Sequence, residues 1–194
     1  MTVFIAGHET TANAMSWLWV ILSQQPEFRM KIEKEVEEVL GNKTPVASDF
    51  PQLPYTLKVF KEILRLYPPV PILPRSIEQD DVLGNYLVNG GGEVFFSPYL
   101  LHRRTDYWKN PETFDPERFE REVERKRHPF AYLPFGGGPR ICLGNNFAMM
   151  EAVFIIAMTT QRFRLNLISD KPIEPLITLT TRPKGGVKVK LERR

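Results

Sequence analysis

The one cysteine of the chain, Cys142, lies in a glycine-rich segment just before a predicted helix. The segment, residues 135–144, reads F-G-G-G-P-R-I-C-L-G. Arg140 and the start of the following helix both favour an anionic sulfur, so a thiolate could act there as a nucleophile or a metal ligand. Isolated cysteines are often small buried hydrophobes, but this loop composition makes that alternative the weaker one. A phosphate-binding loop is excluded because no Lys-Ser or Lys-Thr pair follows the glycines.

A second segment, residues 6–11 (A-G-H-E-T-T), places an acid beside a hydroxyl inside an apolar helical pattern. Gly7 removes a side chain and opens a groove on the helix, and Thr10 can turn its hydroxyl to a backbone carbonyl. Glu9 and Thr10 beside a groove are a plausible proton relay. The zinc-protease alternative fails because position 12, where a second histidine would be needed, is Ala12.

A third group of residues carries opposite charges among apolar neighbours. Glu62 and Arg65 are three positions apart, on one face of a predicted helix, and predict a buried ion pair that needs further partners. The common alternative is a surface pair. Arg118, within the segment D-P-E-R-F at 115–119, is the candidate third member of this cluster.

Composition narrows the class of protein. The chain has 194 residues, 42% hydrophobic and 25% charged, which excludes wholesale disorder. A single cysteine excludes an internal disulfide and a cysteine-based zinc or iron–sulfur cluster. Residues 1–97 hold 8 Lys/Arg and 12 Asp/Glu, whereas residues 98–194 hold 18 and 11, so balances of −4 and +7 add to the net +3. The basic second part indicates either an acidic partner or an unevenly charged solvated surface.

The elements that must position these residues are mainly helical. Hydrophobic periodicity predicts a buried helix at 2–24, an amphipathic helix at 26–40, and further helices at 56–67 and 144–161. Short strands are expected at 70–73, 86–88 and 93–97, and hairpins in the tail at 163–191. Residues 101–141 are predicted to be mostly irregular, and such long stretches are usually functional. The fold class is therefore mainly α with small β-sheets (α+β).

Taken together in this order, the segments resemble the cytochrome P-450 family of haem-thiolate monooxygenases. Residues 6–11 resemble the oxygen-binding groove of its central helix, and Glu62 with Arg65 its E-x-x-R motif. Residues 116–119 resemble its P-E-R-F motif, and residues 135–144 fit F-x-x-G-x-R-x-C-x-G at every fixed position. The resemblance covers 1–194, and it implies the C-terminal, haem-binding portion of a P-450 fold. Because the sequence opens inside a helical pattern, we expect it to be the later part of a protein about twice as long.

The resemblance implies haem b as cofactor, with Cys142 as the axial thiolate ligand of the iron. Phe135 and Gly136 would lie beside the sulfur, and Arg140 would pair with a haem propionate. Other implied cofactor contacts are Arg75 and, more weakly, His102, whose alternative role is structural; Ala6 and Gly7 would leave room for O2. Glu9 and Thr10 would be catalytic, and Glu62, Arg65 and Arg118 would be structural.

The implied reaction inserts one oxygen atom of O2 into a small hydrophobic substrate, with electrons from a flavoprotein reductase or a ferredoxin. No nucleic-acid partner is implied, membrane association is left open, and the expected location is cytoplasmic. Two alternatives are a truncated, non-catalytic fragment that cannot hold haem, and a haem-binding electron-transfer or sensor module. The implied pocket residues are Phe4, Ala6, Val70, Ile72, Leu73, Leu179 and Thr180.

Overall fold

The computed structural model describes residues 2–168 and 171–194, with side chains from residue 6 onward. The four predicted long helices are confirmed, each to within two residues at either end. The short helix α5 interrupts the stretch that was predicted to be irregular, and the short helix α4 ends at the first residue of that stretch. The helices are α1 (Thr2–Gln24), α2 (Pro26–Leu40), α3 (Pro54–Leu66), α4 (Pro98–Leu101), α5 (Arg121–Lys126) and α6 (Asn145–Arg162).

Proline and glycine set the ends of these helices. Pro26 and Pro54 occupy the first positions of α2 and α3, where a missing N–H costs no hydrogen bond. Gly41 ends α2 with a φ of 53°, and its N–H donates to the Glu37 carbonyl oxygen at 3.0 Å. Helix α3 stops at Leu66, just before the proline pair at 68–69.

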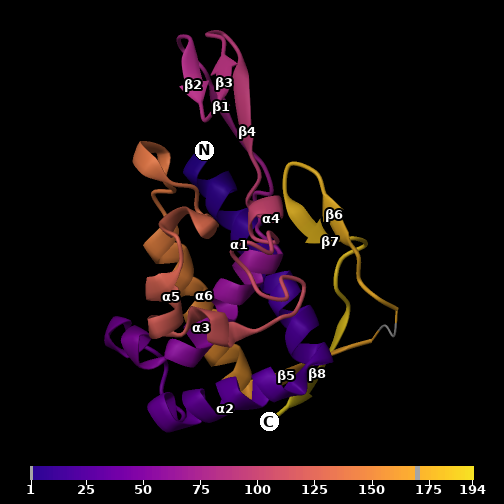
Figure 1. Cartoon of the computed structure of the whole chain (residues 1–194). Coiled ribbons are helices and arrows are strands. Elements are labelled where there is room, and N and C mark those ends of the chain that lie inside the picture. The colour runs from indigo at the N-terminus through magenta and orange to yellow at the C-terminus, as the bar shows by residue number, and fades with distance from the viewer. Residues whose placement is uncertain (1, 169–170) are drawn as a thin grey trace.

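The described strands form four separate two-stranded antiparallel sheets. They pair as β1 with β4, β2 with β3, β5 with β8 and β6 with β7. Figure 1 shows the β1–β4 and β2–β3 pairs at the same end of the molecule as the N-terminus. The strands are β1 (Leu73–Ser76), β2 (Asp81–Leu83), β3 (Tyr86–Val88), β4 (Glu93–Phe96), β5 (Phe163–Leu167), β6 (Pro175–Ile177), β7 (Thr181–Pro183) and β8 (Val189–Arg193).

Two strand predictions need correction. The strand expected at 70–73 begins instead at Leu73, because the prolines at 68, 69 and 71 have no N–H to donate to a ladder. Among the described residues of the tail, only β6 and β7 form a local hairpin. Strand β8 pairs across that hairpin with β5, so that Leu165 lies opposite Leu191.

The core lies where α1, α2, α3 and α6 meet, and its largest members include Trp17, Leu18, Ile32 and Phe60. The prediction that α1 is buried along its length is wrong for its first part. Residues 6–9 are exposed, and the first fully buried residue described in the helix is Ala14. Among the described residues, no helix is long and apolar enough to cross a membrane.

A buried carboxylate joins the second helix to the C-terminal sheet. Glu33 is only 5% exposed and lies 3.0 Å from Arg164 of β5, 3.6 Å from Arg29 and 3.8 Å from Arg194. Arg194 also donates to the Thr160 carbonyl oxygen at 2.7 Å. One carboxylate thus lies within 4 Å of three guanidinium groups, from α2, β5 and the last residue.

Replacing this carboxylate is expected to destabilise the fold, because Glu33→Gln removes the buried negative charge that three guanidinium groups share, and among the described residues only Arg194 keeps a second carboxylate partner, Glu37. Arg164 is partly solvated, so we expect a loss of about 1 to 3 kcal/mol in the free energy of unfolding. Urea titration measures it. The control is Glu38→Gln, which removes a carboxylate from an exposed pair with Lys34 and should change stability by less than about 0.5 kcal/mol. Equal effects of the two variants would contradict the burial argument.

Candidate functional site

The cysteine segment is a loop that folds back on itself. The Cys142 N–H donates to the Phe135 carbonyl oxygen at 3.0 Å, which closes the loop over the glycines. Gly136 and Gly138 have φ values of 74° and 69°, a backbone region that side-chain-bearing residues rarely adopt. The glycines are therefore needed for the turn itself.

The Cys142 side chain is exposed at the entrance to α6. The N–H of Asn145, the first residue of α6, approaches the Cys142 carbonyl oxygen at 3.4 Å. Arg140, two residues before the cysteine, is exposed as well. The thiol is thus accessible from solvent, between an exposed guanidinium in the loop and the first turn of α6.

The predicted ion pair is formed in the interior of the protein, on α3. Glu62 and Arg65 are both 0% exposed, and the Arg65 Nε and Nη2 atoms donate to the two carboxylate oxygens at 2.7 and 2.8 Å. Arg65 Nη1 also donates to the carbonyl oxygens of His102 and Pro111, at 2.9 and 2.7 Å, and Nη2 donates to that of Thr113 at 3.2 Å. These five hydrogen bonds match the five N–H groups of a guanidinium.

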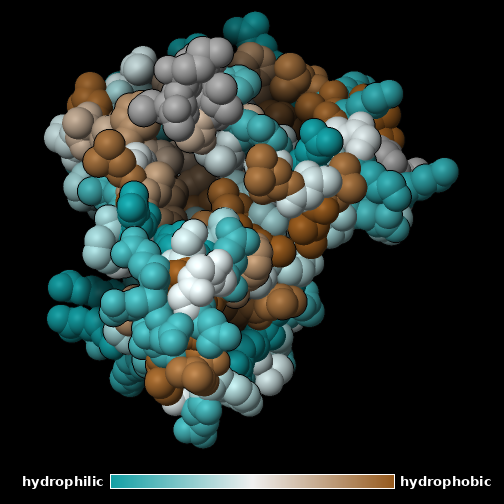
Figure 2. Space-filling model, turned by 90° about the horizontal axis from the view of Figure 1, so that it is seen from above, coloured by the Kyte–Doolittle hydropathy of each residue, from teal (hydrophilic) through white to brown (hydrophobic). Residues whose placement is uncertain are grey.

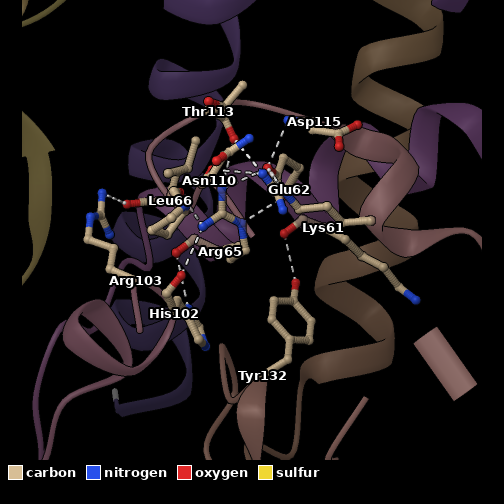
Figure 3. A network of polar contacts seen from close by, with 12 residues as sticks. Lys61, Glu62, Arg65, Leu66, His102, Arg103, Asn110, Thr113, Asp115 and Tyr132 are labelled. Atoms are coloured by element: carbon tan, nitrogen blue, oxygen red, sulfur yellow. Dashed lines mark hydrogen bonds and ion pairs between the residues drawn. The ribbon is translucent and has the colours of Figure 1, made fainter. Parts of the chain in front are cut away.

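The Glu62 carboxylate is satisfied in the same way. Its Oε1 atom accepts the Asp115 N–H at 2.9 Å and lies 3.4 Å from Arg118 Nε. Burial raises the pKa of Glu62, while its bonds to Arg65, Asp115 and Arg118 work against that shift. Figure 3 shows the cluster linking α3 to the irregular stretch. The structure thus brings together Glu62, Arg65 and Arg118.

His102 connects this cluster to the cysteine loop. Its Nδ1 atom lies 3.1 Å from the Arg65 carbonyl oxygen, and its Nε2 atom accepts the Leu133 N–H at 2.9 Å. These partners require the neutral ring with the proton on Nδ1. Burial lowers the pKa of His102 to about 3. The suggestion that His102 binds a haem propionate is therefore corrected: the side chain is 0% exposed and both ring nitrogens are engaged.

Tyr132 provides a second connection that sequence reasoning missed. Its hydroxyl donates to the Lys61 carbonyl oxygen at 2.9 Å. The next residue along the chain is Leu133, whose N–H donates to His102. Burial raises the pKa of Tyr132 well above its usual value, so the hydroxyl remains a donor. The only signal in the sequence was an aromatic residue within a stretch that lacked regular periodicity.

The acid and hydroxyl of α1 have separate partners. Thr10 Oγ1 donates to the Ala6 carbonyl oxygen at 2.6 Å, the backbone contact that the sequence allowed. Glu9 instead accepts a hydrogen bond from Thr180, at 2.8 Å, so Thr180 does not present a free hydroxyl to a pocket. Gly7 is exposed, and a Cβ placed on it would meet no described atom within 4 Å.

Two contacts link segments that carry predicted pocket residues, one of them to the cysteine loop. A Cβ placed on Gly136 would lie 3.7 Å from Leu73 Cδ1, and the Thr181 N–H donates to the Pro69 carbonyl oxygen at 2.9 Å. Ile72 and Leu179 are 49% and 88% exposed, while Val70 and Leu73 are half-buried. The side chain of Phe4 lies outside the described residues.

Arg75, the other predicted propionate contact, lies on β1. Its Nη1 atom donates to the Pro74 carbonyl oxygen at 2.7 Å. It also lines an open cavity of about 390 Å³ together with residues of β2, β3 and β4. The structure therefore does not bring Arg75 into contact with Arg140 or Cys142.

The surroundings of the cysteine expose large apolar side chains. Leu143 is 97% exposed, Phe147 65% and Ile141 50%. The loop that precedes α6 lies at the same end of the molecule as the N-terminus (Figure 1), and Figure 2 shows apolar residues around a hollow on the face seen from that end. These features fit a large, flat, apolar group that carries anionic substituents and an iron atom. The thiol could bind the iron, the guanidinium of Arg140 could pair with an anionic substituent, and the apolar surface could contact the flat face.

Comparisons with known proteins agree with this geometry. The family model described as Cytochrome P450 matches residues 1–191. The chain therefore belongs to the cytochrome P450 family. It spans between a third and about two fifths of the length of the curated relatives described next.

Relatives from distant organisms show similar identity over the whole chain. Cytochrome P450 4V2 of Mus musculus is 41% identical over 198 residues, which are 100% of this chain and 37% of that protein. Protein LUTEIN DEFICIENT 5, chloroplastic, of Arabidopsis thaliana is 38% identical, covering 100% and 33%. Putative cytochrome P450 132 of Mycobacterium tuberculosis is 40% identical, covering 100% and 42%.

Solved structures share the fold. The crystal structure of the cytochrome P450DA heme domain superposes with a TM-score of 0.93 at 32% identity, covering 100% of this chain and 43% of that one. Retinoic acid bound cyanobacterial CYP120A1 gives a TM-score of 0.91 at 33% identity, covering 98% and 44%. The mixture of long helices and small antiparallel sheets is thus the P450 fold.

All five N–H groups of Arg65 donate hydrogen bonds, so we expect even a conservative substitution at this position to lower the stability of the protein. Arg65→Lys keeps the charge but offers three donors, so at least two acceptors are left unpaired in the interior. We expect a loss of about 3 to 5 kcal/mol in the free energy of unfolding. The matched control is Arg125→Lys, because Arg125 forms an exposed pair with Glu122 at the same three-residue spacing. A small effect of Arg65→Lys, close to that of the control, would contradict the assignment of a structural role.

The neutral His102 predicts a specific pH dependence. Its pKa is lowered to about 3 in the folded protein, against about 6.5 when unfolded. A group with a lowered folded pKa contributes its stability above the unfolded pKa and loses it as the pH falls toward the folded value. Between pH 7 and pH 5 this single group should therefore remove about 2 kcal/mol from the free energy of unfolding.

The measurement is urea unfolding at both pH values in the parent protein and in His102→Gln. The glutamine variant can form both hydrogen bonds but cannot titrate, so its loss between pH 7 and pH 5 should be smaller by about 2 kcal/mol. The exposed histidine variant His128→Gln should keep the parent's pH dependence. If His102→Gln kept it as well, the buried neutral imidazole would not be its source.

Proposed function

We propose that this chain forms the haem-thiolate part of a monooxygenase, with Cys142 as the axial ligand. The observation that carries the proposal is the exposed Cys142 thiol, held at the start of α6 by a loop whose glycines adopt left-handed backbone angles. Bound haem supplies redox-active iron, on which O2 is activated for insertion of one oxygen atom into a substrate. Membership of the cytochrome P450 family supports this class of reaction.

The residues around the cysteine would hold the group. Arg140 would bind a propionate, since its exposed guanidinium has no hydrogen-bond partner within the described part of the protein. Phe135 and Gly136 would lie against the sulfur side of the ring, because they belong to the turn that the Cys142 N–H closes. Arg75 is the second candidate for a propionate.

The first helix would serve the oxygen side of the ring. Ala6 and Gly7 leave the helix surface bare, with open space beside Gly7. The hydroxyl of Thr10 donates a hydrogen bond to the Ala6 carbonyl oxygen. Its oxygen can accept one proton while the hydroxyl donates another, so Thr10 can relay a proton. Glu9 is exposed, so it can exchange protons with water and relay them toward Thr10.

The substrate we propose is small and hydrophobic. The exposed Leu179, Ile72 and the half-buried Val70 and Leu73 offer apolar contacts on that side. One relative in structure is described with retinoic acid bound, which is a largely apolar molecule with one carboxylate. The electron donor would be a flavoprotein or a ferredoxin, attracted by the excess of seven positive charges in residues 98–194.

The test is the absorption spectrum of the haem-supplied protein after reduction and treatment with carbon monoxide. We expect a thiolate-type Soret band in the parent and its complete loss in Cys142→Ser, because a serine hydroxyl remains protonated and binds iron weakly. The matched control is Asn146→Ser, an exposed change in the first turn of α6 that should leave the band unchanged.

Two outcomes would contradict the proposal. A thiolate-type band that persists in Cys142→Ser would show that the ligand assignment is wrong. A parent protein that stays folded but takes up no haem would favour the alternative of a fragment without catalytic capacity. An electron-transfer or sensor module is the less favoured alternative, because it needs neither an open oxygen side nor the acid and hydroxyl of α1.

A further inference from the structure

We propose that Thr180 is a positioning residue for Glu9, so that the C-terminal hairpin fixes the group that delivers protons. This inference rests on the proposed function. Thr180 Oγ1 donates to Glu9 Oε1 at 2.8 Å, across 171 positions of sequence. Among the residues that the structure describes, Thr180 is the one hydrogen-bond partner of this carboxylate.

The hairpin is a firm support for this contact. Thr180 is only 9% exposed and precedes β7, which packs against α1 and pairs with β6 through the Ile177–Thr181 register. The Thr178 N–H donates to the Thr180 carbonyl oxygen at 3.1 Å, and the Thr181 N–H donates to that of Pro69 at 2.9 Å. The backbone on both sides of Thr180 is thus held before its hydroxyl reaches Glu9.

The carboxylate, in contrast, has little else to hold it. Glu9 is exposed, and its side chain has three rotatable bonds that would otherwise be free in solvent. A single donor to Oε1 restricts these rotamers and leaves Oε2 available to take a proton from water and pass it on. Proton delivery depends on hydrogen-bond distances, so an acid that samples many rotamers delivers protons less efficiently.

The next residue supplies a matched control. Thr181 is 0% exposed, and its hydroxyl has no hydrogen-bond partner among the described residues. Thr180→Val and Thr181→Val therefore remove the same group from adjacent positions of the same hairpin, but only the first removes a contact with Glu9. Thr180→Ser keeps the donor and is the conservative variant that should restore function.

The first experiment needs no haem. NMR relaxation in the selectively labelled protein measures the order parameters of the methylene groups of Glu9. Thr180→Val should lower them, while Thr180→Ser and Thr181→Val should leave them unchanged. Unchanged order parameters in Thr180→Val would overturn the inference, whether or not the protein binds haem.

The second experiment uses the haem-loaded protein and measures product formed per NADPH consumed, with a flavoprotein donor and a medium-length fatty acid as the probe substrate. Thr180→Val should lower this ratio about fivefold, the loss expected when one hydrogen bond no longer orients the acid. Turnover driven by hydrogen peroxide, which already carries both protons and both electrons, should not change. A purely structural role of Thr180 would lower both the product formed per NADPH and the peroxide-driven turnover, and this result would overturn the inference.

A double variant decides whether Thr180 acts through Glu9. In a Glu9→Gln background, Thr180→Val should cause no further loss of product per NADPH, whereas independent roles would multiply the two losses. Failure of this inference is distinct from failure of the proposed function. An active parent in which Thr180→Val equals Thr181→Val rejects only the positioning role, and a parent without a thiolate-type band rejects the monooxygenase itself.

Discussion

The arrangement of the whole site depends on one buried guanidinium. Arg65 offers five N–H groups in a rigid plane, and each meets an oxygen: two from Glu62 and three from backbone carbonyls of the irregular stretch. A buried charge is tolerated only when its counter-charge and all its hydrogen bonds are supplied. The irregular stretch therefore has to adopt the one path that brings those carbonyls to α3, although few of its residues are in helices or strands.

This constraint reaches the cysteine through one histidine. The Arg65 side chain holds the His102 carbonyl oxygen, and the His102 ring bonds the Arg65 carbonyl oxygen on one side and the Leu133 N–H on the other. Leu133 lies two residues before Phe135, whose carbonyl oxygen accepts the Cys142 N–H. A series of hydrogen bonds thus runs from the last turn of α3 to the cysteine loop. Because Arg65 and His102 are buried and bind backbone groups at each link, the series fixes the backbone path that leads to the cysteine loop.

Much of this arrangement could be predicted from the sequence, since its signals are local. Helical periodicity predicted α1, α2, α3 and α6, and three-residue spacing predicted that Glu62 and Arg65 would pair. The role of His102 could not be settled, because nothing in a linear pattern states which backbone groups will meet its two ring nitrogens. The β5–β8 pairing and the Glu9–Thr180 contact were missed for the same reason: their partners are distant in sequence.

The structure therefore divides the site into a rigid side and an open side. The side that holds Cys142 is anchored by the saturated cluster on α3. On the other side, residues 6–9 of α1 are exposed, where the apolar helical pattern predicted burial. There Glu9 contacts the C-terminal hairpin through Thr180. In the proposed function, Cys142 is a ligand that must keep a constant distance to a metal, whereas Glu9 is an acid that must stay in contact with water. The side with Cys142 thus depends on many buried hydrogen bonds, whereas the side with Glu9 depends on the single hydrogen bond from Thr180.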